Sequence, residues 1–146
     1  MDGAEVGAET VTFRPGEARN TSLTADVPTA GSVTLLFDAV LPVAATYDEP
    51  LALSASGGTD VKWAPTLANL RRVTLPVLAA TGLDASVDRR TGGFYPAGGG
   101  NARIRVRPSA LSPLDLRERG VRARVEVHST ATESLAGEKV ADRQDE

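Results

Sequence analysis

The residues best suited to chemistry lie in a glycine-rich segment, Gly93 to Gly100, which reads GFYPAGGG. Its last three glycines leave backbone N–H groups that a phosphate can approach closely. Arginines on both sides would supply the countercharge, namely Arg89, Arg90, Arg103, Arg105 and Arg107. The residues that we predict to bind phosphate are Gly98, Gly99, Gly100, Arg103 and Arg105. The alternative is a glycine-rich hairpin between two strands, with a solvated arginine face.

A second candidate is the loop Gly57–Asp60, which reads GGTD and is followed by Trp63. It lies after a predicted strand and before a predicted helix, where open α/β units commonly bind ligands. The alternative is a plain strand–helix loop in which Asp60 is a cap and Trp63 is a packing anchor.

Two single residues complete the inventory. Asp38 is the one charge inside an apolar run, and a buried carboxylate needs a partner. We therefore expect Asp38 to face a polar cleft or to meet an arginine such as Arg71. His128 is the only histidine and lies on the polar side of a predicted strand, which is typical of a surface residue. We predict no catalytic residue and no metal ligand in this chain.

Composition limits the chemistry further. The chain has 146 residues, a net charge of −3 and no cysteine, which excludes disulfides, thiolate zinc sites and cysteine nucleophiles. Residues 1–61 hold two basic and nine acidic side chains, residues 62–124 twelve and four, and residues 125–146 two and six. A basic middle on an acidic chain favours a local anion site over a surface that coats nucleic acid.

Hydrophobic patterns predict the elements that must position these residues. The predicted strands cover residues 10–13, 21–27, 51–55, 83–87 and 102–107. One predicted helix covers residues 33–47, is capped by Ser32 and is kinked by Pro42; the other begins at Thr66 or Asn69 and ends near Gly82. The order after the edge strand at 10–13 is strand, helix, strand, helix, strand, strand. This order predicts an α+β fold in which a four-stranded sheet is covered on one face by two helices.

After this unit the pattern changes. We predict short strands at residues 114–116 and 121–128 and the start of a polar helix at 134–144. These pieces hold too little apolar surface for their own core, so they read as the opening of a further unit. The most apolar stretch, residues 35–47, is too short to span a bilayer, and we expect a soluble, cytoplasmic protein with no membrane association.

Six segments resemble RNA 3′-terminal phosphate cyclases, and GFYPAGGG is close to diagnostic of that family. The segments are residues 3–16, 29–43, 57–65, 70–78, 93–100 and 111–120. The resemblance implies βαβαββ repeats akin to those of enolpyruvyl transferases, with a smaller domain inserted in the third repeat. It makes residues 1–16 the end of repeat one, 17–109 repeat two and 110–120 the start of repeat three. Residues 1–120 would then be the repeat region, and 121–146 a truncated start of the inserted domain.

The resemblance also implies a reaction. In the family, ATP adenylylates a histidine, AMP passes to the 3′-phosphate of RNA, and the 2′-hydroxyl closes a 2′,3′-cyclic phosphate with the help of Mg²⁺ or Mn²⁺. The nucleophilic histidine and the first-repeat nucleotide loop have no counterpart here, and His128 does not match that nucleophile. We therefore expect no catalysis by this chain alone. The implied partners are RNA 3′ ends and either a second copy or a chain that supplies the missing repeats.

Three residues match the wall of the family's nucleotide site: Asp38, Pro65 and Asn69. Asp38 stands where glutamine is common, and Asn69 stands where an aromatic residue is usual. Gly92 likewise replaces a basic residue. These departures leave an alternative open, namely a non-catalytic cyclase-like module that binds RNA and proteins in ribosome assembly.

Overall fold

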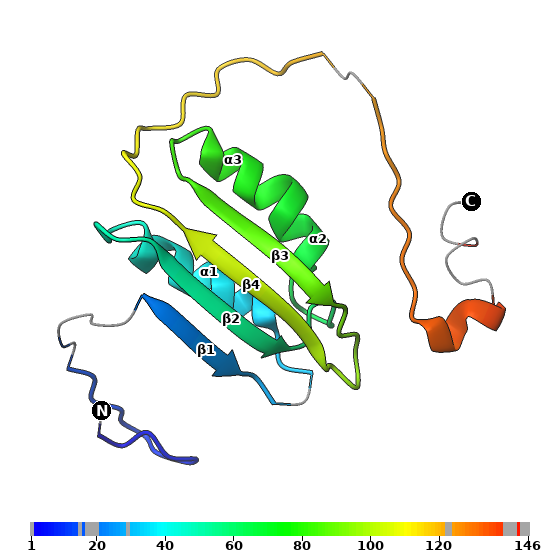
Figure 1. Cartoon of the computed structure of the whole chain (residues 1–146), viewed down its shortest axis with the longest axis horizontal. Coiled ribbons are helices and arrows are strands. Elements are labelled where there is room, and N and C mark those ends of the chain that lie inside the picture. The colour runs from blue at the N-terminus through cyan, green and yellow to red at the C-terminus, as the bar shows by residue number, and fades with distance from the viewer. Residues whose placement is uncertain are drawn as a thin grey trace.

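The computed structural model describes residues 2–14, 16, 21–28, 30–121, 124–138 and 143. The strands are β1 (Ser22–Asp26), β2 (Leu51–Gly57), β3 (Ala85–Thr91) and β4 (Gly100–Val106). They form one sheet in the order β1-β2-β4-β3 (Figure 1). β1 and β2 are parallel, whereas β4 is antiparallel to both of its neighbours. The predicted α+β fold is confirmed.

The first helix, α1 (Val33–Ala44), covers β2 and β4 (Figure 1). Ser32 caps it as predicted, because its Oγ accepts a hydrogen bond from the backbone N–H of Leu35 at 3.2 Å. Pro42 lies inside the helix, which ends three residues before the predicted end at Tyr47.

The second helical layer has three parts: α2 (Leu67–Asn69), the π-helical η1 (Leu70–Thr74) and α3 (Leu75–Ala79). Of the two predicted caps, Thr66 is the one used, since its Oγ1 accepts from the Asn69 N–H at 3.1 Å. The wide turn η1 ends two residues before Pro76, which has no N–H to donate and whose ring would crowd the carbonyl four residues earlier. Gly82 follows with a φ of +95°, as expected of a glycine after a helix.

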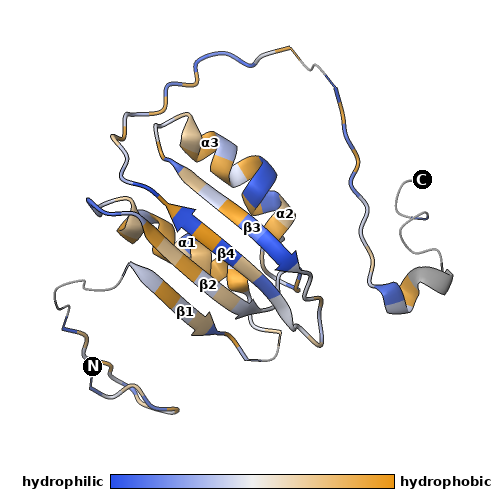
Figure 2. Ribbon diagram, in the orientation of Figure 1, coloured by the Kyte–Doolittle hydropathy of each residue, from blue (hydrophilic) through white to orange (hydrophobic). Residues whose placement is uncertain are grey.

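The sheet has one apolar and one polar face. Leu51, Leu53 and Ala55 of β2 are buried against the helices, as are Ala102, Ile104 and Val106 of β4. The residues between them point to the open face and include Ser54, Arg103 and Arg105. Figure 2 shows the alternation along β4. In residues 102–107, Ala, Ile and Val alternate with arginine, which predicts an apolar and an arginine side of this strand, and the structure confirms that division.

The ends of the chain differ from the sequence-based expectations. Residues 10–13 form no sheet strand; Thr12 makes an isolated antiparallel bridge with Asp2, and Pro15 of the expected turn lies outside the described residues. Residues 114–121 and 124–128 have no strand, so those predictions are wrong where the chain is described. The reason is that a strand needs a neighbour for its backbone hydrogen bonds, and no described strand pairs with these segments. The valines of the expected strand are accordingly exposed, Val121 to 98%.

The expected helix at 134–144 is the short 3₁₀-helix η2 (Glu133–Glu138); residues 139–142 and 144 lie outside the described part. No helix among the described residues is long and apolar enough to cross a membrane.

Candidate functional site

The GGTD and GFYPAGGG loops interlock at one end of the sheet. The buried hydroxyl of Thr59 accepts a hydrogen bond from the Gly93 N–H at 2.9 Å. In return, the Gly93 carbonyl accepts from the N–H groups of Thr59 and Asp60 at 2.8 and 3.0 Å. We call residues 57–65 and 93–100 together the loop cluster. Backbone and hydroxyl groups from two distant loops hold it in a single arrangement.

Close packing explains several glycines of the loop cluster. A Cβ on Gly93 would lie 2.2 Å from the Gly100 nitrogen and 2.4 Å from the Gly57 oxygen, both backbone atoms. The segment between Gly93 and Gly100 is a hairpin, in which the Gly98 N–H donates to the Phe94 carbonyl at 2.7 Å. The hairpin alternative therefore describes the conformation of this segment.

The hairpin changes what the three predicted phosphate-binding glycines can donate. The Gly98 N–H is already used, and Gly100 is buried in β4 opposite Gly57. Gly99 is exposed, with a φ of +73° and open space around its Cα. Phosphate binding at these glycines stays a prediction, and Gly99 is the residue best placed for it.

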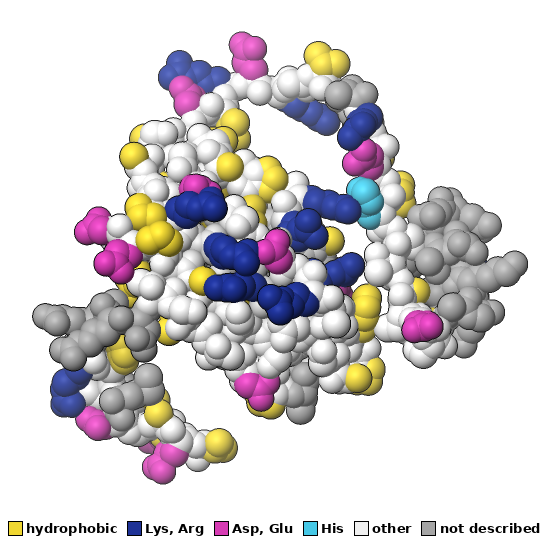
Figure 3. Space-filling model, viewed as in Figure 1, with side chains coloured by type: hydrophobic (Ala, Val, Ile, Leu, Met, Phe, Trp, Pro, Cys, Tyr) yellow, Lys and Arg dark blue, Asp and Glu magenta, His cyan; other side chains and the backbone are white. Residues whose placement is uncertain are grey.

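Arg103, Arg105 and Arg107, which we call the arginine row, lie along the open face of β4 and its end. Figure 3 shows basic side chains gathered over β3 and β4. Two of these arginines have acidic partners on the β3 side: Arg105 pairs with Asp88, and Arg107 contacts both oxygens of Asp84 at 3.1 Å. The hydrogen bond and charge of Arg105 lower the pKa of Asp88. Arg103 is half-buried, and its Nε has no hydrogen-bond partner among the described residues.

Trp63 is not the packing anchor of the alternative interpretation. Its side chain is 92% exposed, and its φ of +61° is unusual for a residue other than glycine. Next to it, the Lys62 ammonium lies 4.6 Å from the centre of the Tyr95 ring. The loop cluster therefore presents a basic and aromatic rim.

The three predicted nucleotide-wall residues do not line a common cavity among those the described residues form. The Pro65 carbonyl accepts from the Thr34 hydroxyl at 2.7 Å, which ties this loop to α1. Asn69 is exposed on the outer side of α2. Asp38 lies one turn after Thr34, in a groove between α1 and α3. Their role in nucleotide binding stays a prediction.

The groove around Asp38 is apolar and has a volume of about 420 Å³. Its other lining residues are Leu41, Pro42, Ala45, Thr74, Leu78, Thr81, Leu83 and Leu111. Burial raises the pKa of Asp38, and its carboxylate has no hydrogen bond or ion pair with a described residue. The expectation of a polar cleft or an arginine partner is therefore wrong. The reason is that this face of α1 meets the apolar side of α3, whereas Arg71 is exposed.

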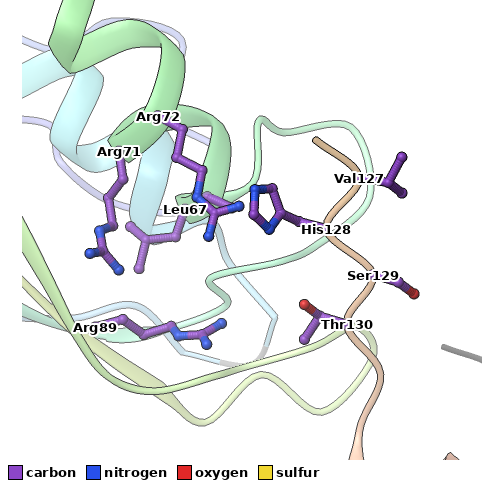
Figure 4. Close-up of a pocket in the computed structure, with 9 residues that line it drawn as sticks. Leu67, Arg71, Arg72, Arg89, Val127, His128, Ser129 and Thr130 are labelled. Atoms are coloured by element: carbon purple, nitrogen blue, oxygen red, sulfur yellow. The ribbon is translucent and has the colours of Figure 1, made fainter. Parts of the chain in front are cut away.

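Sequence analysis missed a second basic site. Arg71 and Arg72 of η1, Arg89 of β3 and His128 line a cavity of about 360 Å³ (Figure 4), which we call the basic pocket. The remaining lining residues are Leu67, Ala68, Val127, Ser129 and Thr130. The sequence contains two adjacent arginine pairs, Arg71-Arg72 and Arg89-Arg90. Their spacing along the chain does not predict that three of these side chains line one cavity.

The family implies ATP and a divalent metal, and the described residues do not complete a site for either. They contain no group of three His, Cys, Asp or Glu side chains that could hold a metal ion. Asp38, Pro65 and Asn69 do not together enclose a nucleotide. The lone histidine, His128, lies 3.5 Å from Glu126 on the rim of the basic pocket.

Comparison with known proteins agrees with the sequence motifs. A sequence model of the RNA 3′-terminal phosphate cyclase family matches residues 1–142. The RNA 3′-terminal phosphate cyclase of Halobacterium salinarum is 44% identical over 156 aligned residues, which cover 98% of this chain and 45% of the relative. The cyclase of Methanothermobacter thermautotrophicus is 39% identical over 84% of this chain and 36% of its own length. That of Archaeoglobus fulgidus is 38% identical over 76% of this chain and 34% of its own length. The chain thus spans less than half the length of these relatives, and it belongs to the RNA 3′-terminal phosphate cyclase family.

Proposed function

We propose that this chain is part of an RNA 3′-terminal phosphate cyclase, with residues 1–120 in its repeat region, and that the whole enzyme converts an RNA 3′-phosphate into a 2′,3′-cyclic phosphate at the expense of ATP. The observation that carries the proposal is the 44% identity to the Halobacterium salinarum cyclase across 98% of the chain. We also propose a cytoplasmic location, where both RNA and ATP are available.

The geometry of the loop cluster supports the proposal. Its hydrogen bonds fix Pro65 near α1 and hold the hairpin beside the basic row of β4. We propose that Pro65 and Asn69 belong to the adenine side of a nucleotide site, and that Asp38 lies near its ribose or phosphate. The phosphate side would be formed by Gly98, Gly99, Gly100, Arg103 and Arg105. Bound ATP supplies the adenylyl group that activates the RNA phosphate; these residues bind and orient.

Further chain is needed for the reaction in this proposal. Leu35, Val43, Val73 and Val77 on the outer surfaces of the helices are about half exposed, and such apolar surface commonly marks an interface. We propose that the chain pairs with a second copy or with a chain that supplies further repeats. A monodisperse monomer at high concentration in light scattering would contradict this part.

RNA binding tests the proposal directly. The chain is titrated against a short RNA that ends in a 3′-phosphate and against the same RNA with a 3′-hydroxyl. We expect tighter binding of the phosphate form, and Arg103→Ala/Arg105→Ala should remove that preference. Arg117→Ala/Arg119→Ala removes the same charge from the exposed segment after the sheet and serves as the matched control. Equal affinity of the wild type for both RNAs would contradict the proposal.

A second candidate is the non-catalytic, cyclase-like binding module. The observation that favours it is Asn69, an exposed amide where the family has a stacking aromatic ring. Incubation with radiolabelled ATP and Mg²⁺ in the presence of the missing repeats separates the two candidates. Label transferred to protein supports the enzyme, and its absence together with RNA binding supports the module. With the 146 residues alone we expect no label, and a labelled band that is lost in His128→Ala would overturn that expectation.

A further inference from the structure

The basic pocket is separate from the arginine row of the open face. Arg71 and Arg72 project from η1, Arg89 from the helix-facing side of β3, and His128 from the extended segment that passes the sheet edge. Figure 4 shows the three arginines, which come from the helix and the sheet, facing His128 and Thr130 of that segment across one cavity. Segments that are distant in the sequence thus bring four nitrogen-bearing side chains together.

None of the three arginines of the basic pocket pairs with an acidic side chain among the described residues, although the charge of Arg71 helps to lower the pKa of Asp88. None makes a hydrogen bond or ion pair with a described residue, whereas Arg105 and Arg107 of the open face are both paired. The acids nearby are already engaged, since Asp88 pairs with Arg105, and Glu126 lies 2.5 Å from Arg124 and 3.5 Å from His128. Like charges held close together repel, so an anion in this cavity would be stabilised.

The chemistry of the lining selects the anion. A guanidinium group presents paired N–H donors in a plane that matches two oxygens of a phosphate. The Thr130 hydroxyl adds a donor, and Leu67 and Ala68 form the apolar part of the wall without competing for the ligand. We propose that the basic pocket binds a phosphate group through Arg71, Arg72 and Arg89, with His128 at its rim. Where that phosphate belongs to an RNA strand, the inference rests on the proposed function.

Two sources of phosphate share this chemistry, a backbone phosphodiester of RNA and a free nucleotide. Three probes distinguish them: a 10-nucleotide RNA with a 3′-hydroxyl, ATP, and inorganic phosphate. Each is titrated into the full chain at about 50 and 200 mM salt. If substitutions in the basic pocket weaken RNA binding and leave ATP affinity unchanged, the pocket binds a backbone phosphate of RNA. If they weaken ATP binding, the pocket binds a nucleotide.

The variant that tests the basic pocket is Arg71→Gln/Arg72→Gln/Arg89→Gln. Its matched control, Arg14→Gln/Arg117→Gln/Arg119→Gln, removes the same charge from exposed positions outside the pocket. We expect the pocket variant to lose at least about tenfold in affinity for the bound probe. For RNA, the salt dependence should also fall by about 0.7 in log–log slope per lost phosphate contact. The control should change affinity less than about threefold, since it removes net charge alone.

Three outcomes would overturn the inference: wild-type affinity in the pocket variant, an equal loss in the control, or no binding of any probe by the wild type. If the triple variant does not fold by circular dichroism, Arg72→Gln and Arg89→Gln are each compared with Arg119→Gln, and equal affinity again overturns it. The RNA has no terminal phosphate, so failure here is independent of the 3′-phosphate preference that tests the proposed function.

Discussion

The loop cluster and the helix side of the sheet differ in whether their polar groups have hydrogen-bond or ion-pair partners. In the loop cluster, the buried Thr59 hydroxyl and the Gly93 backbone satisfy one another. On the helix side, Asp38 lies in an apolar groove, and neither its carboxylate nor the arginines of the basic pocket make a hydrogen bond or ion pair with a described residue. The loop cluster is therefore held in one conformation by its own hydrogen bonds, whereas the helix side leaves charged groups unpaired among the described residues, and it is there that we propose an anion binds. Four substitutions test this contrast.

The largest effect is expected from Gly93→Ala. The new methyl group would lie within 2.6 Å of three backbone atoms of Gly57 and Gly100, so the two loops must separate. We expect a loss of about 3 kcal/mol in the free energy of unfolding, measured by urea denaturation. Gly120→Ala is the control, because a Cβ there meets nothing within 4 Å. Similar stability of the two variants would show that the loop cluster is not tightly packed.

Thr59→Val should have the next largest effect. Valine keeps the shape of threonine but removes the oxygen that accepts the buried Gly93 N–H. An unsatisfied buried donor costs about 1–3 kcal/mol, which denaturation would detect. Thr46→Val is the matched control, since that exposed hydroxyl only caps a carbonyl at the end of α1. An equally small loss of stability in both variants would show that the hydrogen bond between Gly93 and Thr59 does not stabilise the loop cluster.

These two sites also show where prediction from sequence ends. The alternation along residues 51–55 and 102–107 predicted β2, β4 and their faces, because the side-chain period of a strand is local. The meeting of Gly93 with Gly57 depends on strand order, and that of Arg71 with Arg89 depends on how η1 lies against β3. The alternation at 121–128 failed for the complementary reason. It satisfies the local pattern of a strand, but no described strand pairs with it.

Asp38→Asn tests the helix side, and here the expected change is a gain. Burial raises the folded-state pKa of Asp38, so its ionised form lowers stability above that pKa. Asparagine removes the charge, and we expect a small gain in the free energy of unfolding at pH 7, because Asp38 is only partly buried and water screens its charge. The gain should vanish as the pH falls below the ordinary aspartate value, where both side chains are neutral. Asp48→Asn on the surface is the control, and a pH-independent gain would refute this explanation.

The smallest effect is expected from Asp88→Asn. This substitution tests whether the ion pair of Asp88 with Arg105 stabilises the open face of the sheet, as hydrogen bonds stabilise the loop cluster. The hydrogen bond and charge of Arg105 lower the folded-state pKa of Asp88, so the ionised carboxylate stabilises the sheet above its ordinary pKa. That contribution should be lost as the pH falls from about 4 toward the lowered pKa. The wild type should therefore be slightly more stable than Asp88→Asn at pH 6, and the two should converge once the pH falls below the lowered pKa of Asp88. Because the pair is exposed, added salt should also shrink the difference. Asp115→Asn, whose carboxylate pairs with Arg117 outside the sheet, is the control for removal of one negative charge. If the free energies of unfolding of Asp88→Asn and Asp115→Asn depend on pH in the same way, the ion pair of Asp88 with Arg105 contributes nothing to stability. Arg105 would then be as weakly paired as the arginines of the basic pocket, and the contrast between the arginine row and the basic pocket would fail.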